Sequence, residues 1–584
     1  MECCLAFIEL DNVTYTYPVP GAAPQPALRG ISLRIAEGEY VAIVGANGSG
    51  KSTLARMLNA LLLPTGGAVR VAGWDTRDAA AHQEIRRIVG MVFQRPEDQL
   101  VAATVQEDVA FGPENLGLPP ADIRARVEEA LETVGMADLR ERPPTLLSAG
   151  QMQRVALAGV LAMRPRCIVF DEATAMLDPG GRRAVRAMLR QMHTMGLTLV
   201  VVTHFMEEAV DADRVIVLER GRVALDDAPA AVFSNAQPLH ALGLTLPPAA
   251  VLAESLRARV PTLPPGLLTI PALAAALDAL PHHAPPLSPI AAPPPSPPAA
   301  PLIDMRHLAH TYLAGTPLAS PSLRDASLTV AAGGAHGLLG ATGAGKSTLM
   351  QHLNALLRPQ SGAVRVGDFD LNDPAVDVRA VRRYVGLSFQ MPEMQIFEQY
   401  VGDEIAYGPR LLGLTRTELR ARVRWAMTLV GLDFDAFKDR LTFTLSGGER
   451  RKVALAATLA LQPAILLLDE PTAGLDPAAR ADLLDRLAAL RETGVTLLLS
   501  SHQMEDVARL TEQVTALAQG VNALSGPVNE VFAQSDTLHA LGLDTPVIGQ
   551  LVDVLRARGW SLPPTSLSVD DLCSWLLSEN FSTD

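Results

Sequence analysis

Short apolar runs recur along this chain of 584 residues, and each is followed by a glycine-rich or polar segment. The run at residues 40–44 predicts a buried strand. Residues 197–202 and 495–499 predict two more strands of the same kind. After the first run, apolar positions recur at the spacing of a helix: Leu54, Met57, Leu58 and Leu61.

The loop between that strand and that helix, residues 45–52, reads Gly-Ala-Asn-Gly-Ser-Gly-Lys-Ser and fits the phosphate-binding pattern G-x-x-x-x-G-K-[ST]. Its glycines allow the backbone to turn tightly and to direct N–H groups at phosphates. We expect Lys51 to reach the β- and γ-phosphates and the Ser52 hydroxyl to ligate Mg²⁺. Because the loop opens a predicted helix, the N-terminus of that helix points at the phosphates.

The whole pattern occurs twice. The loop returns at residues 340–347, and its lysine, Lys346, lies 295 residues after Lys51. Further segments repeat in the same order: Phe93-Gln94 and Phe389-Gln390, Ser148 and Ser446, Asp171-Glu172 and Asp469-Glu470, His204 and His502. In both copies the first acid of the pair lies 23 residues after the serine, and the histidine lies 33 residues after that acid. Chance does not produce such spacings, so the chain contains two copies of one unit.

An acidic pair follows an apolar run in each copy. Beside a phosphate loop, the first carboxylate, Asp171 or Asp469, is expected to help hold Mg²⁺ through its water shell. The second, Glu172 or Glu470, is expected to orient or deprotonate the attacking water. A solvated turn is the alternative for an Asp-Glu pair, but the preceding apolar run argues against it.

Composition narrows the class of protein. With 48% hydrophobic and 19% charged residues the chain is globular, and its net charge of −14 argues against a nucleic-acid partner. The four cysteines form no C-x-x-C pair, so we expect neither a zinc site nor a disulfide framework. No apolar run is long enough to span a membrane, so any membrane role is expected to be peripheral.

A proline-rich segment without charged residues, residues 281–301, predicts a polyproline spacer between the copies. We assign residues 1–226 and 302–525 to two ATPase domains. Residues 227–280 and 526–584 each contain a short helical pattern and are predicted to be small helical appendages, with a plain C-terminal helix as the alternative.

Residues 147–151 (Leu-Ser-Ala-Gly-Gln) and 445–449 (Leu-Ser-Gly-Gly-Glu) resemble the signature motif of ABC transporter nucleotide-binding domains. The resemblance covers both copies nearly end to end. It implies an α/β fold with two P-loop NTPase domains of the ABC type, each with a helical subdomain. It also implies that the domains pair head to tail within the chain, with each ATP held between one phosphate loop and the other signature.

In that arrangement Ser148 contacts the γ-phosphate on Lys346, and Ser446 contacts the one on Lys51. Ala149 departs from the family pattern, because it replaces the first signature glycine and adds a methyl group near the phosphate. Both glutamates and both histidines are present, so we predict two hydrolytic sites. The site that uses Lys346 with Ser148 is the more affected by this departure.

The resemblance also implies roles for individual residues. Tyr17 and Tyr312 would stack on adenine, with a core or surface tyrosine as the alternative. Asp178 and Asp476 would couple the two sites. The expected catalytic residues are Glu172, Glu470, the γ-phosphate sensors His204 and His502, and the water-sensing Gln94 and Gln390. The expected metal site comprises Ser52, Gln94 and Asp171 in one copy and Ser347, Gln390 and Asp469 in the other. The expected nucleotide contacts are Tyr17, Gly45, Asn47, Gly48, Gly50, Lys51, Ser52, Thr53, Ser148, Gly150, Gln151, Tyr312, Gly340, Gly343, Gly345, Lys346, Ser347, Thr348, Ser446, Gly447, Gly448 and Glu449.

Segments after the two glutamines and around the acidic pairs resemble the ATPases of energy-coupling factor (ECF) importers and of related cobalt and nickel importers. The resemblance implies ATP and Mg²⁺ as cofactors, and a transmembrane coupling subunit and a substrate-binding membrane subunit as partners. It implies a peripheral position at the cytoplasmic face of the cell membrane and a micronutrient substrate: a vitamin, a vitamin precursor, or a cobalt or nickel ion. Glu97, Asp98 and Glu393 would face arginines of the coupling subunit, with a solvated acidic face as the alternative.

Two other classes share the tandem arrangement. The tandem ATPases of sugar importers often have one degenerate site, whereas both motif sets here are nearly complete. Tandem-ABC translation factors join their domains by a strongly basic helical linker, whereas the linker here is proline-rich and uncharged.

Overall fold

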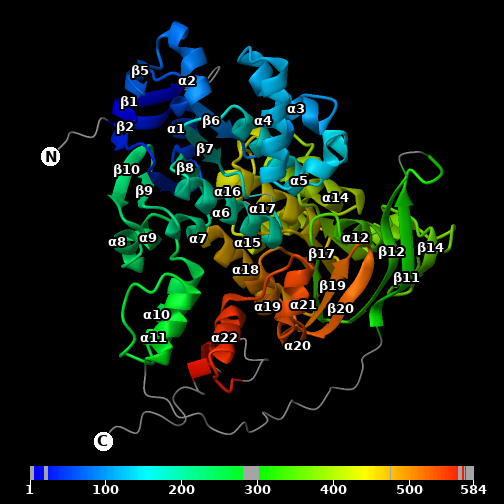
Figure 1. Cartoon of the computed structure of the whole chain (residues 1–584). Coiled ribbons are helices and arrows are strands. Elements are labelled where there is room, and N and C mark those ends of the chain that lie inside the picture. The colour runs from blue at the N-terminus through cyan, green and yellow to red at the C-terminus, as the bar shows by residue number, and fades with distance from the viewer. Residues whose placement is uncertain are drawn as a thin grey trace, which may run out of the picture. The chain divides into compact units, whose positions relative to one another are not determined.

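The computed structural model describes residues 6–18, 24–175, 177–279, 301–316, 319–473, 475, 477–562, 569–570 and 572–573. The chain divides into two compact units, Met1–Ala279 and Leu280–Asp584, which are described one at a time (Figure 1). Among the described residues, no helix is long and apolar enough to cross a membrane.

Unit 1 contains two sheets. The first is antiparallel, with strand order β2-β1-β4-β5, and the second has the order β10-β9-β3-β8-β7-β6. Their strands are β1 (Ile8–Tyr17), β2 (Gln25–Ile35), β3 (Tyr40–Val44), β4 (Gly66–Val71), β5 (Trp74–Asp75), β6 (Val89–Val92), β7 (Cys167–Asp171), β8 (Thr198–Val202), β9 (Arg214–Glu219) and β10 (Arg222–Asp227). The helices are α1 (Lys51–Leu58), α2 (His82–Ile88), α3 (Val105–Asn115), α4 (Pro120–Thr133), α5 (Ala149–Ala162), α6 (Pro179–Thr194), α7 (Met206–Val210), α8 (Pro229–Val232), α9 (Ala236–Ala241), α10 (Pro248–Arg257) and α11 (Ile270–Asp278).

The parallel strands of the second sheet carry the site. Every residue of β3, β7 and β8 is buried, which is typical of strands covered on both faces. Strand β8 pairs in parallel with both β3 and β7, so all three strands end at one edge of the sheet. The phosphate loop follows β3 and the acidic pair closes β7, so the topology brings the two predicted motifs to the same edge.

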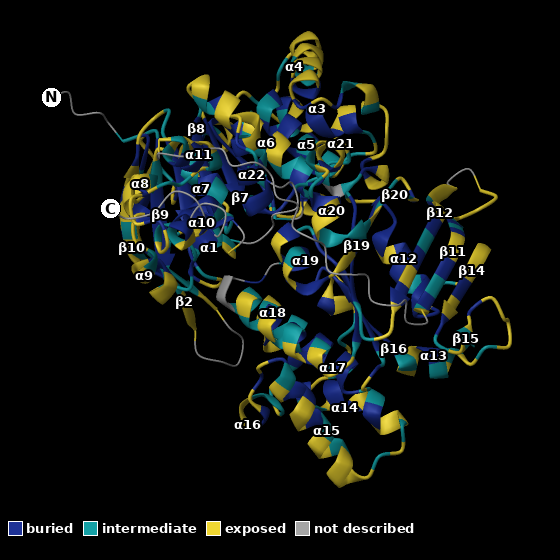
Figure 2. Ribbon diagram, turned by 90° about the horizontal axis from the view of Figure 1, so that it is seen from below, coloured by how far each residue is buried: buried dark blue, intermediate teal, exposed yellow. Residues whose placement is uncertain are grey.

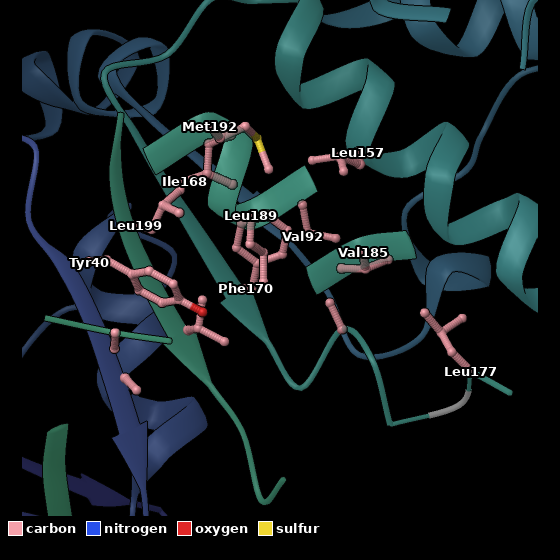
Figure 3. Close-up of a cluster of buried hydrophobic side chains, with 14 of the residues drawn as sticks. Tyr40, Val92, Leu157, Ile168, Phe170, Leu177, Val185, Leu189, Met192 and Leu199 are labelled. Carbon is pink, nitrogen blue, oxygen red and sulfur yellow. The ribbon is translucent and has the colours of Figure 1, made fainter. Parts of the chain in front are cut away.

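Helices complete unit 1. Helices α3, α4 and α5 form a helical layer drawn mainly in cyan (Figure 1), and their faces alternate between buried and exposed positions (Figure 2). Helix α6 packs on the second sheet, where Val185, Leu189 and Met192 meet Ile168, Phe170 and Leu199 (Figure 3). This packing fixes the segment that follows the acidic pair.

The helix predicted after the phosphate loop is shorter than its apolar pattern suggests. Leu54, Met57 and Leu58 are buried as expected, but Leu61 lies beyond the end of α1 and is 43% exposed. Ala60 adopts a left-handed φ of 56°, which is incompatible with a continuing helix.

Unit 2 repeats the architecture, but its two sheets are joined into one of ten strands, ordered β15-β14-β11-β12-β20-β19-β13-β18-β17-β16. One parallel bridge, Asp325 to Val521, makes the join, whereas unit 1 has a backbone hydrogen bond from Arg29 to Gly221 at the equivalent place. The strands are β11 (Pro301–Tyr312), β12 (Ser320–Ala331), β13 (Ala335–Leu339), β14 (Ser361–Val366), β15 (Phe369–Asp370), β16 (Val385–Ser388), β17 (Ile465–Asp469), β18 (Thr496–Ser500), β19 (Gln513–Ala518) and β20 (Val521–Pro527). The helices are α12 (Lys346–Leu353), α13 (Val378–Tyr384), α14 (Val401–Leu411), α15 (Arg416–Leu429), α16 (Phe434–Phe437), α17 (Gly447–Leu459), α18 (Pro477–Glu492), α19 (Met504–Leu510), α20 (Val528–Phe532), α21 (Ser535–Ala540) and α22 (Val547–Ala557).

The domain boundaries stay predictions, with two local differences. Strand β11 begins at Pro301, inside the predicted spacer, and β20 continues to Pro527, past the predicted end of the second ATPase domain. Residues 280–300, which include most of the spacer, lie outside the described residues. The helical patterns expected in the appendages fall within α10 and α22.

Candidate ATP site

The phosphate loop of unit 1 wraps around its own lysine. Lys51 is buried, and its Nζ donates to the carbonyl oxygens of Gly45 at 2.7 Å and Ala46 at 3.1 Å. Gly50, with φ 102°, is the N-cap of α1, so the helix begins at the lysine. The loop therefore brings the backbone N–H groups at the start of α1 and the positive end of this helix to one point, as the sequence predicted for phosphate binding.

The loop of unit 2 has the same geometry. Lys346 Nζ donates to Gly340 O at 2.6 Å and to Ala341 O at 3.2 Å, and Gly345, with φ 104°, is the N-cap of α12. The predicted contact residues Asn47, Gly48, Gly343 and Ser347 are exposed at the two loops. Both loops therefore have the shape that binds phosphate.

In unit 1 the predicted catalytic side chains meet at Glu172. Gln94 Nε2 donates to Glu172 Oε2 at 3.1 Å, and His204 Nδ1 lies 3.7 Å from the same oxygen. Lys51 Nζ lies 4.0 Å from Glu172 Oε1. The structure thus brings three residues from three separate segments of the sequence to the Glu172 carboxylate.

In unit 2 the arrangement at Glu470 differs in part. His502 Nε2 lies 3.2 Å from Glu470 Oε1, and the His502 backbone N–H donates to Glu470 Oε2 at 3.1 Å. Among the described residues, the Gln390 side chain makes no hydrogen bond to Glu470. Instead, the Gln390 carbonyl oxygen accepts from Arg451 at 2.9 Å, and Arg451 also donates to the Glu470 carbonyl oxygen.

Both glutamates that are predicted to be catalytic have a left-handed backbone, with φ 52° at Glu172 and 51° at Glu470. This conformation is uncommon for a residue with a side chain and costs about 1–2 kcal/mol. The backbone N–H of each glutamate donates to the carbonyl oxygen at the end of the adjacent strand, from Val202 or Ser500, which holds the turn in place. The same conformation recurs at other equivalent positions, such as Ala60 and Ala355, so it belongs to the backbone that the two units share.

The acidity of the two glutamates differs because their surroundings differ. Burial alone would raise the pKa of Glu172, but the hydrogen bond and charge of His204, together with Lys51, outweigh it and leave the pKa below its ordinary value. At Glu470 burial dominates and raises the pKa to about 7. The two predicted bases therefore hold their protons to different degrees at neutral pH.

This difference predicts opposite effects on stability. The Glu470 carboxyl group has its ordinary pKa of 4.5 in the unfolded chain and a raised pKa of about 7 in the folded one. Its contribution to the free energy of unfolding is therefore fully present below pH 4.5 and is lost as the pH rises towards 7. Glu470→Gln should therefore raise the urea midpoint at pH 8, by an amount that corresponds to about 3 kcal/mol, and change it little at pH 5. Glu172→Gln should lower the midpoint at both pH values, because the lowered pKa of Glu172 stabilises the fold wherever it is ionised. An equal shift of both variants at pH 8 would contradict the assignment.

Asp171 and Asp469, the first acids of the two pairs, are the predicted metal ligands, and their hydrogen bonds differ. Asp171 is buried, burial raises its pKa, and the Ser52 hydroxyl hydrogen-bonds to it, while its Oδ1 has no hydrogen-bond partner. Asp469 Oδ1 accepts from Ser500 Oγ at 2.6 Å. A carboxylate with an unsatisfied oxygen beside a serine hydroxyl is the hard oxygen donor set that Mg²⁺ prefers.

The two tyrosines predicted to stack on adenine lie at the phosphate loops. The hydroxyl groups of Tyr17 and Thr53 lie 3.1 Å apart, and those of Tyr312 and Thr348 3.2 Å apart. The tyrosine residues are 37% and 38% exposed. The hydroxyl group anchors each tyrosine beside the loop, while much of its ring stays open to a flat base.

The signature serines cap helices. Ser148 and Gln151 form a reciprocal capping box at the start of α5, and Ser446 and Glu449 form one at the start of α17. Gly150, Gly447 and Gly448 lie in the first turn of these helices, and Ser446 is exposed. Both signatures therefore lie at the N-terminus of a helix, where the helix dipole favours an anion. The contact with the other unit stays a prediction.

Asp178 is the N-cap of α6, where its Oδ1 accepts from the Gly181 N–H at 2.7 Å. Asp476 lies outside the described residues, so its predicted coupling role is not addressed.

Two residues that shape the second site were missed in the sequence. Ser500 donates to Asp469 and accepts from the Glu470 N–H at 3.1 Å, while unit 1 has Val202 at this position. Arg451, which binds the two carbonyl oxygens described above, replaces Gln153 of unit 1, whose side chain donates to Phe93 O at 3.2 Å. The available signal was a polar residue two positions before the sensor histidine, in place of an apolar one.

Both units are similar in sequence to known proteins. A family model described as ABC transporter matches residues 28–175 and 323–473. An ABC transporter ATP-binding protein of Methanosarcina mazei is 34% identical over 98% of this chain and 98% of its own length. Another, of Bifidobacterium longum, is 37% identical over 87% of this chain, which spans 65% of that protein. The energy-coupling factor transporter ATP-binding protein EcfA1 of Symbiobacterium thermophilum is 57% identical over 46% of this chain and 96% of its own length.

Proposed function

Because this chain belongs to the ABC transporter family and carries two ATP-binding, ATP-hydrolysing units, we propose that it is the energy-coupling ATPase of an ECF-type importer. The likeness that supports this choice is the 57% identity to an EcfA1 protein over nearly half of the chain. The proposed cargo is a micronutrient, which separate membrane subunits would select and carry. The chain would lie at the cytoplasmic face of the membrane, bound to a transmembrane coupling subunit.

We propose that Mg²⁺ accompanies ATP. Ser52 and Asp171, with Gln94 nearby, would hold the ion in unit 1, and Ser347 and Asp469 in unit 2. The metal would neutralise charge on the β- and γ-phosphates. Glu172 would orient the attacking water and accept its proton, while Gln94 and His204 hold that carboxylate in position.

The two units are proposed to pair head to tail, so that the loop with Lys51 uses Ser446 and the loop with Lys346 uses Ser148. A double-variant series tests this pairing. With the second site inactivated by Glu470→Gln, Ser446→Arg should abolish the remaining ATP turnover, whereas Ser148→Arg should leave most of it. The reverse result would mean that each loop uses the signature of its own unit.

A groove in unit 1 is the proposed docking place for a helix of the coupling subunit. It measures about 740 Å³ and lies between α2 and β6 on one side and α3 and α5 on the other. Gln99 lines it and connects it to the site, because its side chain accepts from Phe93 N at 3.2 Å and donates to Met91 O at 3.3 Å. A shift of an inserted helix would therefore be transmitted to Gln94, the neighbour of Phe93.

The three acidic residues proposed to pair with arginines of the coupling subunit differ in how available their charges are. Glu97 and Asp98 are exposed on the single turn Pro96–Asp98 beside the groove. Glu393 Oε1 accepts from Arg450 at 3.1 Å within its own unit, which reduces its charge available to a partner. We therefore retain Glu97 and Asp98 as the stronger candidates.

Purification from its native membranes in mild detergent tests the proposal. The expected result is recovery of the chain with two membrane proteins, a coupling subunit and a substrate-binding subunit, identified by mass. Recovery with subunits of a sugar importer, or sedimentation with ribosomes at moderate salt, would support the alternative classes. Recovery of this chain alone would contradict the importer function.

A further inference from the structure

Unit 1 contains a pocket that shares no residue with the ATP site. It measures about 480 Å³ and lies between α3, α4 and the turn Ala137–Leu139. Its floor is apolar, with Leu131 buried and Ala110, Ile123 and Val127 partly exposed. Its rim is charged and comprises Glu107, Glu114, Arg124, Glu128 and Arg140.

Unit 2 indicates what such a pocket accommodates. Helix α15 corresponds to α4, and beside it the ring of Phe434 is only 9% exposed and packs in the same core cluster as Val423 and Met427. The guanidinium carbons of Arg424 and Arg420 lie 4.5 and 5.6 Å from the centre of that ring. An aromatic ring covered by a cation thus fills this position in unit 2.

Unit 1 lacks this internal ring because its connecting segment is shorter. Equivalent backbone hydrogen bonds mark the end of this segment in both units, because the Val105 N–H donates to Arg142 O and the Val401 N–H donates to Arg440 O. The segment from the end of α4 to Arg142 is two residues shorter than the segment from the end of α15 to Arg440. Ala137 of the shorter segment lies at the wall of the pocket. The apolar floor is retained, but the residue that would cover it is missing.

Two of the charges at the rim are also reversed. The positions of Arg410 and Arg424 in unit 2 are occupied by Glu114 and Glu128 in unit 1, while Arg420 corresponds to Arg124. A ring bound in unit 1 would therefore meet a carboxylate where unit 2 supplies a cation. A ligand with an aromatic ring and a positive charge beside it could pack its ring on the apolar floor and pair its charge with the carboxylates of the rim.

We propose that this pocket binds a phenylalanine side chain that a partner polypeptide presents next to an arginine or lysine. The ring replaces Phe434 on the apolar floor, and the cation pairs with Glu128 and Glu114. This proposal concerns the helical layer alone and does not depend on the importer function.

Calorimetric titration of the full-length chain with the capped tripeptide Arg-Phe-Arg tests the proposal. We expect saturable binding with a Kd below about 1 mM, and at least about tenfold weaker binding of Arg-Ala-Arg, because the buried ring supplies most of the affinity. Glu128→Arg should weaken binding about threefold or more, and Ala137→Phe, which supplies a ring from within, should abolish it. Glu132→Arg, the same charge change on α4 outside the pocket, should leave binding unchanged.

ATP turnover provides the folding control, because none of these residues belongs to the ATP site and each variant should retain it. Three results would overturn the proposal: no saturable binding, equal binding of the two peptides, or equal weakening by Glu128→Arg and Glu132→Arg. Unchanged binding in Ala137→Phe would show that the peptide binds elsewhere.

Discussion

Replacing Glu172 or Glu470 by glutamine is expected to slow ATP hydrolysis at the altered site by about 10²–10⁴-fold. Glutamine keeps the size and most hydrogen bonds of the side chain but cannot accept the proton of the attacking water. Each glutamate closes a buried strand in a left-handed turn and lies within 4 Å of its sensor histidine. These contacts fix the carboxylate beside the phosphate loop, so the change removes its chemistry without removing its position.

Steady-state phosphate release from the full chain measures this loss. Because the chain holds two sites, each single variant should fall to about half of the original turnover or below, and the double variant should show the full loss. Glu132→Gln, an exposed glutamate on α4, is the matched control and should not change turnover. Retention of ATP binding separates a catalytic loss from unfolding.

The two single variants also test whether both sites hydrolyse. Glu470 binds its proton more tightly than Glu172, and the opposite signature carries Ala149 in place of glycine. If Glu470→Gln left turnover unchanged, the site of unit 2 would be silent. A loss in both variants would support two working sites with different surroundings.

With the site of unit 2 inactivated by Glu470→Gln, Gly50→Ala is expected to lower kcat/KM for ATP by about 10²-fold or more, because it displaces the loop that positions the phosphates. Gly50 has φ 102°, and a Cβ there would lie 2.7 Å from the Ala27 carbonyl oxygen and 2.8 Å from Leu28 Cδ2. The backbone oxygen belongs to β2 and cannot move without disturbing the sheet. The loop and the start of α1 must shift instead.

Gly48→Ala is the matched control in the same loop. Its φ of 78° is also left-handed, but a Cβ there would meet nothing within 4 Å. Its effect should be limited to about 1–2 kcal/mol of backbone strain and a smaller loss of kcat/KM. ATP turnover measured over a range of ATP concentrations in the Glu470→Gln background gives kcat/KM for both variants, and equal losses would contradict the role assigned to the contact with Ala27.

The sequence alone determined the repeat, the loops and the acidic pairs. Gly-rich loops and buried strands are local patterns, since backbone conformation and apolar runs depend on neighbouring residues. The sequence also placed Lys51, Glu172 and His204 after predicted strands, whereas their meeting at one sheet edge follows from the parallel pairing of β8 with β3 and β7. The end of α1 was predicted less well, because it ends in a left-handed turn at Ala60, and an alanine in the sequence does not indicate such a turn.

Only the tertiary structure decided how the two copies differ. Ser500 and Arg451 act on Asp469, Glu470 and Gln390 through contacts between residues far apart in the sequence, and neither belongs to a motif. The pKa of a buried carboxylate depends on all the charges and the desolvation around it, so two identical acidic pairs acquired different acidities. The pocket between α3 and α4 has the same origin, because it arises where a shorter loop leaves an apolar floor uncovered.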